Sequence, residues 1–140
     1  MTINRKLALV AASVAVLACT SANAVDAPSH KPGLWETRMQ IGGHTRVTQM
    51  CTDAATEARN LATTAAYMKA NCTKNELSQQ GDTFVSDTVC TFAGQHVVGH
   101  GVTTRIGDSA FHTEGTTIVD AKWLGPCKPG QKPGDMMRLP

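Results

Sequence analysis

Histidines are the side chains of this sequence whose spacing is most easily tested for chemistry, because imidazole binds metals and transfers protons near neutral pH. His96 and His100 fall on one face of a predicted strand, but four residues of strand span about 13 Å. Two imidazoles that far apart cannot share one zinc ion, whose nitrogen ligands lie about 2.0–2.1 Å away. His112 is predicted on the opposite face, and His44 in a remote turn. The spacing therefore predicts no metal site and no cofactor.

Nucleophilic catalysis has no better support in the sequence. The chain contains no Gly-x-Ser-x-Gly elbow, and Ser109 sits in a predicted turn with no evident base. The pair Gly99-x-Gly101 lacks the third glycine and the following helix of a phosphate-binding loop. These patterns favour a protein that is not an enzyme.

The carboxylates do not form a pair that spacing alone would bring together. Glu36, Asp87 and Glu114 are isolated on different predicted strands, where such residues are usually solvated. One catalytic alternative stays open. It is a hydrolase or metal-dependent enzyme with an unrecognised site around His96, His100 and Glu114.

The cysteines indicate disulfides. One of the five, Cys19, lies in an apolar leader, and an even number remains. None of them forms Cys-x-x-Cys, so thiol redox catalysis and the common zinc modules fit poorly. An even number of cysteines in a small exported domain is typical of a disulfide framework. We therefore expect no free thiolate in the mature chain.

One predicted hairpin decides the pairing of these cysteines. Gly81 can take the positive φ of a tight reversal, and the runs on each side suit strands. Folding the chain about Gly81 brings Cys72 opposite Cys90, at a spacing that a disulfide can bridge. Cys51 and Cys127 then remain as the second pair.

Residues 1–24 have the features of an export signal. Asn4-Arg5-Lys6 is a basic start, an apolar run follows from Leu7 to Ala18, and Ala22-Asn23-Ala24 matches a small-x-small cleavage site. The apolar run is shorter than the roughly 20 residues of a spanning helix. We expect a soluble periplasmic product without a transmembrane span. The alternative is a lipoprotein anchored at Cys19, because Val16-Leu17-Ala18-Cys19 resembles a lipobox.

Removal of this leader balances the charge of the chain. The full sequence carries 13 lysines and arginines against 11 aspartates and glutamates. Arg5 and Lys6 leave with the leader and no acid does, which leaves 11 bases, 13 minus 2, against 11 acids. No surplus of positive charge remains to drive binding to nucleic acid.

The apolar periodicity predicts one α+β domain over residues 32–127, after a linker at 25–31 and before a flexible tail at 128–140. The fold is a curved antiparallel meander of about six strands with one inserted helix. The predicted strands cover residues 34–41, 45–51, the run from Cys72 up to a turn at 80–82, 83–92, 96–106 and 110–119. An Ala-rich helix follows Thr52 or Asp53 as its cap. This helix is expected to pack on the sheet, with partner binding as the alternative.

The predicted registers bring apolar side chains to one face of the sheet. Pairing Ile41 with Thr45 places Trp35 opposite Cys51, and a turn at 93–95 orients the fifth strand. The shared apolar face then comprises Phe84, Cys90, Phe92, Val98, Val102, Ile106, Phe111 and Val119.

Several short segments resemble the bacterial domain-of-unknown-function family 3617. They are Lys31-Pro32-Gly33-Leu34-Trp35-Glu36 after the export signal, Gln49-Met50-Cys51, Asn71-Cys72, Val89-Cys90, Trp123-Leu124-Gly125-Pro126-Cys127 and the tail segment Lys132-Pro133-Gly134-Asp135-Met136. The resemblance covers almost the whole mature chain. It implies a small exported envelope protein with paired cysteines and transfers no catalytic residue.

These observations favour a binding or structural module whose concave sheet face holds a small apolar ligand or an envelope protein. The expected lining residues are Trp35, Met39, Val98, Val102 and Phe111. Neither the ligand nor the partner can be named from the sequence.

Overall fold

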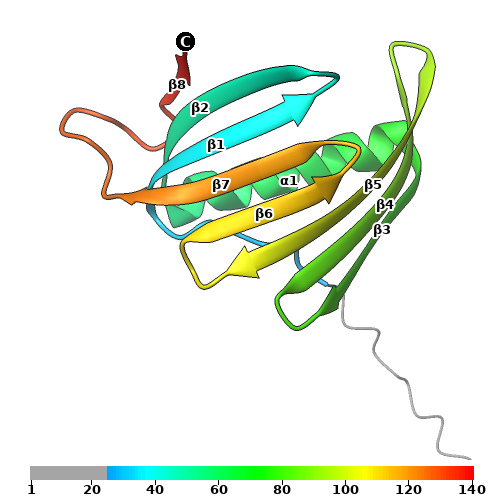
Figure 1. Ribbon diagram of the computed structural model, residues 1–140, viewed down its shortest axis with the longest axis horizontal. Helices are drawn as coiled ribbons and strands as arrows, with labels where there is room; N and C mark the ends of the chain where they lie inside the picture. The colour runs from blue at the N-terminus through cyan, green and yellow to red at the C-terminus, as the bar shows by residue number, and fades with distance from the viewer. Residues whose placement is uncertain (1–24) are drawn as a thin grey trace, which may run out of the picture.

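One antiparallel sheet and one helix make up the fold, as the computed structural model shows for residues 25–140 (Figure 1). The strands are β1 (Gly33–Ile41), β2 (His44–Thr52), β3 (Cys72–Gln80), β4 (Thr83–Phe92), β5 (Gln95–Ile106), β6 (Ala110–Gly115), β7 (Ile118–Gly125) and β8 (Met136–Leu139), and the helix is α1 (Ala54–Asn71). Their order in the sheet is β3-β4-β5-β6-β7-β1-β2-β8. The antiparallel sheet with one inserted helix is confirmed. The predicted signal peptide and Cys19 lie outside the described residues.

The prediction of about six strands is wrong, because the sheet has eight. The predicted strand from Ala110 to Val119 is interrupted at Thr116 and Thr117, and its second half continues as β7. The segment 128–140, predicted as a flexible tail, contains β8, which pairs with β2. Gly134 N donates to the Cys51 carbonyl at 2.8 Å, and Cys51 N donates to the Asp135 carbonyl at 3.0 Å. Backbone hydrogen bonds, which leave no side-chain pattern, hold this segment.

The first hairpin differs from its predicted register by one residue. Gly42 and Gly43 both have positive φ, which makes a two-residue turn, so Ile41 pairs with His44 and not with Thr45. Cys51 therefore lies opposite Leu34, and Trp35 lies opposite Met50.

A second one-residue difference changes the face of β5. Ala93 and Gly94 form a two-residue turn with positive φ, so Phe92 pairs with Gln95. Since side chains alternate along a strand, this shift moves Val98, Val102 and Ile106 to the face opposite Phe84. Their predicted place on the shared apolar face is wrong.

A third difference compensates for the second. The β5–β6 connection has three residues, 107–109, because Ile106 pairs with Ala110. Phe111 consequently returns to the face of Phe84, as predicted, whereas His112 lies on the face of His100. The prediction that His112 lies on the opposite face is wrong.

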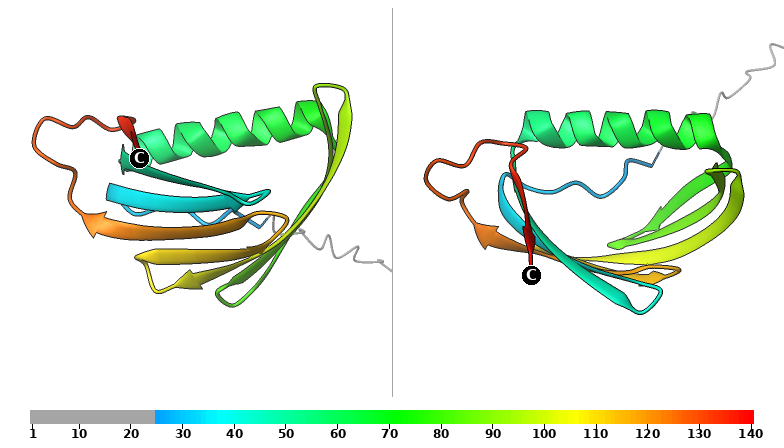
Figure 2. Two further views of the ribbon diagram at one scale, coloured as in Figure 1. Left: turned by 45° about the horizontal axis from the view of Figure 1, so that its top comes forward. Right: turned by 90° about the horizontal axis from the view of Figure 1, so that it is seen from above.

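The sheet curves around α1, which lies along its concave side (Figure 2). Asp53 caps the helix: its Oδ1 accepts a hydrogen bond from Thr56 N at 2.7 Å. The helix contacts chiefly β3 and β4. Thr56 and Glu57 are its buried residues, and most of its other side chains are exposed. The helix therefore spans the concave side without packing tightly against the whole of it.

The buried apolar core is small. Trp35, Phe111 and Ala121 form it, with Trp123 partly buried beside them. Trp35 on β1 is 1% exposed. It is opposite Trp123 of β7, because β7 pairs with β1. The core therefore combines side chains of β1 with side chains of β7, which comes late in the sequence and pairs with β1.

Both tryptophans donate hydrogen bonds to the segment that leads into β1. Trp35 Nε1 donates to the Lys31 carbonyl at 2.8 Å, and Trp123 Nε1 donates to the Pro32 carbonyl at 3.1 Å. Lys31 Nζ lies 4.0 Å from the centre of the Trp123 ring and 2.9 Å from Asp108 Oδ1. The two motifs that contain Trp35 and Trp123 therefore meet in the structure, where both indoles bond to the segment just before β1.

Gly33 lies beside the Trp123 indole, where a residue with a side chain would not fit. Its φ is +136°, and a Cβ there would lie 2.2 Å from Trp123 Nε1 and 2.5 Å from the Gly125 carbonyl oxygen. Gly33→Ala should therefore lower the free energy of unfolding by about 2–4 kcal/mol, from backbone strain and overpacking. Gly43→Ala is the matched control. Gly43 also has positive φ, +80°, but nothing lies within 4 Å of its added Cβ, so about 1 kcal/mol is expected. Urea denaturation measures both, and equal losses would contradict the close-approach argument.

Two disulfides join the elements. Cys72–Cys90 links β3 to β4 and Cys51–Cys127 links β2 to the segment after β7, which is the pairing that the hairpin argument predicts. Cys51 and Cys90 are buried, and the second bridge fixes β2 and the chain after β7 to each other.

The long-range bridge should contribute more to stability. The sequence separations are 76 residues for Cys51–Cys127 and 18 for Cys72–Cys90. Chain entropy then predicts losses of about 4.5 and about 3 kcal/mol when each pair is replaced by alanines. Thermal unfolding of the two double variants measures this difference, and a less stable Cys72→Ala/Cys90→Ala protein would contradict it.

Candidate functional site

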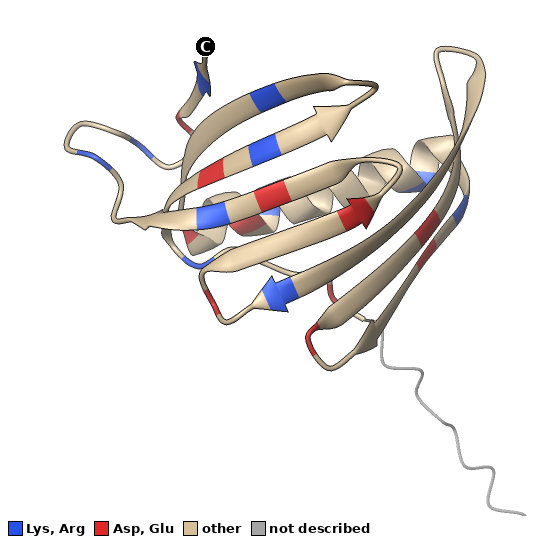
Figure 3. Cartoon of the chain, viewed as in Figure 1, with Lys and Arg blue, Asp and Glu red and all other residues tan. Residues whose placement is uncertain are grey.

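The two faces of the sheet differ sharply in charge. The strand registers place every carboxylate of the eight strands on the convex face, which faces away from α1. Figure 3 marks these acids along the strands. They are Glu36, Glu76, Asp87, Glu114 and Asp120. The convex face is therefore the solvated face of the sheet.

Among residues 25–140, the concave face carries mostly apolar and hydroxyl side chains, together with Arg105 and Arg46, and no strand places a carboxylate on it. Its central residues, by register, are Trp35, Thr37, Met39, Phe84, Ser86, Thr103, Phe111, Thr113, Val119 and Ala121. Thr103 and Thr113 share a hydrogen bond, 2.8 Å between their Oγ1 atoms, which satisfies both hydroxyls. Away from the small core, Met39, Thr103 and Val119 remain half-buried. This face can contact an uncharged molecule without desolvating an acid.

The structure divides the predicted ligand-lining residues between the two faces. Trp35, Met39 and Phe111 lie on the concave face, where Trp35 and Phe111 belong to the core. Val98 and Val102 lie on the convex face, and Val98 is 70% exposed. The five residues therefore do not surround one ligand.

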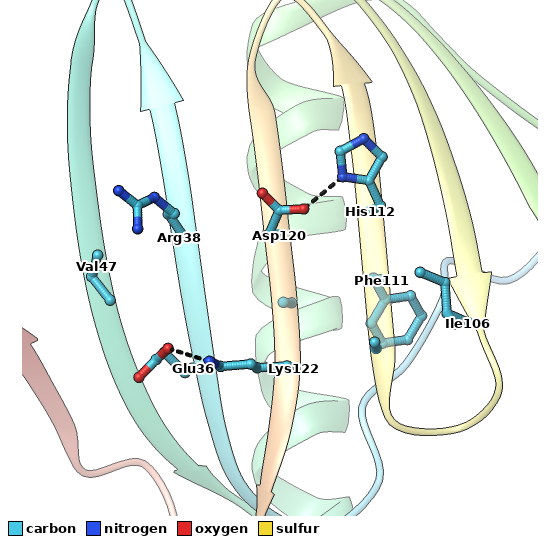
Figure 4. Close-up of a pocket in the computed structure, with 10 residues that line it drawn as sticks. Glu36, Arg38, Val47, Ile106, Phe111, His112, Asp120 and Lys122 are labelled. Carbon is cyan, nitrogen blue, oxygen red and sulfur yellow. Dashed lines mark hydrogen bonds and ion pairs between the residues drawn. The ribbon is translucent and has the colours of Figure 1, made fainter.

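The convex face has a shallow hollow of about 270 Å³ over β1, β7 and β6 (Figure 4). Its lining residues are Glu36, Arg38, Val47, Ile106, Ala110, Phe111, His112, Asp120, Ala121 and Lys122. Two ion pairs cross it. Lys122 Nζ lies 3.1 Å from Glu36 Oε1, and His112 Nδ1 lies 2.6 Å from Asp120 Oδ1. The lining includes no serine, threonine or cysteine that could act as a nucleophile.

The charges of this hollow are largely satisfied by each other. Gln49 Nε2 donates to Glu36 Oε2 at 2.9 Å, and this bond and Lys122 hold the pKa of Glu36 below its usual value. Arg38 is paired across the strands with Asp120, but the Asp120 carboxylate points to His112 (Figure 4). Such a network of paired charges is typical of a solvated sheet surface.

The three residues of the catalytic alternative each contact a different side chain. His96 Nδ1 lies 3.4 Å from Thr91 Oγ1, and His100 Nδ1 lies 2.8 Å from Asp87 Oδ1. Glu114 Oε1 lies 3.3 Å from His112 Nε2. Within residues 25–140, no group of three His, Cys, Asp or Glu side chains is arranged to hold a metal ion. All three lie on the convex face, and among residues 25–140 no hydrogen bond or ion pair joins one of them to another.

His112 is the histidine most strongly tied to acids. Its bond to Asp120, and secondly its bond to Glu114, raise its pKa above the ordinary value of 6.5. Because the pKa is raised in the folded state, this contribution to stability is complete below pH 6.5 and is lost as the pH rises through the higher folded pKa.

NMR titration should show this shift. The imidazole of His112 is expected to titrate above 6.5, and Asp120→Asn should move its pKa back down because the largest cause is removed. The second cause is tested by Glu114→Gln, which should lower the pKa less. A His112 pKa at or below 6.5 in the unaltered protein would contradict the assignment.

A further contact joins the helix to the sheet on the concave side. His30 Nδ1 and His30 N both lie 2.9 Å from Glu57 Oε1. The His30 ring lies edge-on to Trp35, with ring centres 4.6 Å apart, and 5.2 Å from Phe111. Sequence reasoning missed this pair. The available signals were a lone acid in the first helical turn and a histidine next to the Lys31-Pro32-Gly33 motif.

A second hollow lies at the mouth of the concave side. Its volume is about 330 Å³, and its lining residues are Ser29, His30, Lys31, Asp82, Arg105, Gly107, Asp108 and Phe111. Arg105 binds Asp82 Oδ1 through Nε at 3.0 Å and through Nη2 at 2.7 Å. With Lys31 held by Asp108, the cations of this mouth are paired as well.

In the part of the chain that the structure describes, no helix has the length and apolar character needed to cross a membrane.

Comparison with known proteins gives one match. A family model described as "Protein of unknown function (DUF3617)" matches residues 30–127. This range includes all strands from β1 to β7, the helix and both disulfides. Neither the search of curated proteins nor the search of solved structures found a significant match.

Proposed function

Since this chain belongs to the DUF3617 family of proteins of unknown function, we propose its role from its own surfaces. It is an exported binding module that holds a small apolar ligand between α1 and the concave face of its sheet. Its role is to bind and not to catalyse.

The observation that carries this proposal is the charge difference between the faces. The strands place all five of their carboxylates on the convex face, whereas the concave face keeps half-buried apolar and hydroxyl side chains and one half-buried cation, Arg105, which is paired with Asp82. The helix does not bury this face completely. Leu61 and Met68 share the helical stripe of buried Glu57, yet both are only half-buried. An apolar ligand that buries this half-exposed apolar surface gains binding free energy from the hydrophobic effect.

Export is supported by the bridges. Cys51–Cys127 and Cys72–Cys90 take up all the cysteines of the described residues. Disulfides form and persist in oxidising compartments such as the bacterial periplasm. Together with the predicted leader they support a periplasmic protein.

A pair of neighbouring substitutions tests the binding face. Thr103 lies on the concave face and Thr104, its neighbour on β5, lies exposed on the convex face. Thr103→Glu should weaken the binding of the neutral fluorophore N-phenyl-1-naphthylamine by about tenfold or more, because it places a charge against the ligand. Thr104→Glu should leave the binding unchanged. Fluorescence titration measures both dissociation constants.

The nearly isosteric Thr103→Val separates charge from shape. It removes the bond to Thr113 and keeps the size of the side chain, so it should bind the fluorophore as well as the unaltered protein. Equal weakening by Thr103→Glu and Thr104→Glu, or no binding by the unaltered protein, would rule out this face.

A further inference from the structure

The segment that precedes β1 lies on the ligand side of the sheet. We call residues 25–32 the strap. It runs between α1 and the concave face before it enters β1 (Figure 2). His30 bridges the two layers, because it bonds to Glu57 of the helix and packs against Trp35 and Phe111 of the sheet. The strap therefore occupies part of the space that the proposed ligand would use.

The buried end of this space has an acid that the strap alone satisfies. Glu57 is 7% exposed. Its Oε1 accepts from His30 N and lies 2.9 Å from His30 Nδ1, and these are its side-chain partners among residues 25–140. A buried carboxylate that loses its donors is strongly destabilised. Anything that displaces His30 must bring Glu57 a new donor.

The surroundings of His30 also define a shape. Two aromatic rings, 4.6 Å and 5.2 Å from the imidazole centre, enclose it on the sheet side in edge-on geometry. Such contacts favour another flat ring in the same place. A flat group that also donates N–H bonds would reproduce all the contacts of His30.

We propose that the strap is a built-in competitor, and that the ligand is a flat apolar ring bearing a protonated amine that displaces His30 and binds Glu57. This inference rests on the proposed function and specifies its ligand. An acidic ligand is excluded from this end, because it would place a second negative charge beside the Glu57 carboxylate. The ligand binds only those molecules in which the strap is displaced. Its apparent affinity is therefore the intrinsic affinity multiplied by the fraction of such molecules.

The probes are three naphthalene derivatives that share one ring system. They are 2-naphthylmethylamine, which is cationic, 2-naphthoate, which is anionic, and the neutral N-phenyl-1-naphthylamine. Each is titrated into the purified protein and its variants. The variants are His30→Ala, which removes the competing side chain, Glu57→Gln, and Ala27→Ser as a control at an exposed strap residue that lines neither hollow.

Three results are expected. His30→Ala should bind the amine about fivefold or more tightly than the unaltered protein does, because the competitor is weakened. In the His30→Ala background, the amine should bind about tenfold or more tightly than the naphthoate, and Glu57→Gln should remove most of that preference. Ala27→Ser should behave as the unaltered protein. Peptide mapping of both disulfides and circular dichroism verify that each variant is folded.

The opposite results overturn the inference. Equal or weaker binding of the amine by folded His30→Ala would make the strap a structural segment and not a competitor. Equal binding of amine and naphthoate would remove the role of Glu57. In both cases the neutral fluorophore, with its dependence on Thr103, still reports on the concave face, so the proposed function stands or fails separately.

Discussion

The approach of Trp123 to Gly33 is the contact on which the architecture depends. Only a residue without a side chain lets the indole reach the chain there, since a Cβ would lie 2.2 Å from Trp123 Nε1. The approach lies where β7 pairs with β1, and next to it both indoles bond to carbonyls that precede β1. The same junction is held by the β1–β7 ladder, which runs from Leu34–Gly125 to Gln40–Ile118. The Cys51–Cys127 bridge secures the same junction covalently.

The proposed function rests on how the curved sheet divides its side chains between its two faces. Strict alternation over the registers sends the acids outward, and the helix lies along the inner side while contacting chiefly β3 and β4. The outer charges then neutralise one another in pairs such as Glu36–Lys122 and His112–Asp120. Among residues 25–140, the one buried acid is Glu57, which comes from the helix and accepts hydrogen bonds from the strap. The outer face is thus a surface of paired charges, whereas much of the inner face is half-buried apolar and hydroxyl surface.

The sequence predicted the sheet, the helix cap and the stapled hairpin because their causes are local. Gly81 marks the turn, and Asp53 has the side chain that a helix start needs. The registers were harder to predict, because one extra residue in a turn moves every side chain of the next strand to the other face of the sheet. The turns at 93–94 and 107–109 each differ by one residue from the predicted length. Val98 follows only the first turn and lies on the wrong face, whereas Phe111 follows both and lies on the predicted face. β8 and the His30–Glu57 bond depend on segments that meet only after folding, and no local pattern announces them.

The pairing of β7 with β1 also governs the order in which this protein can fold. The partners Trp35 and Trp123 are separated by most of the domain, and the neighbouring strands β1 and β2 form a local hairpin. Contacts so distant along the chain close slowly, because a long loop must be ordered before they form. During folding, one edge of β1 consequently stays unpaired until β7, which ends at Gly125, pairs with it. The first strand to be made is thus among the last to acquire both of its neighbours, and for that interval it is an open edge that other chains can reach.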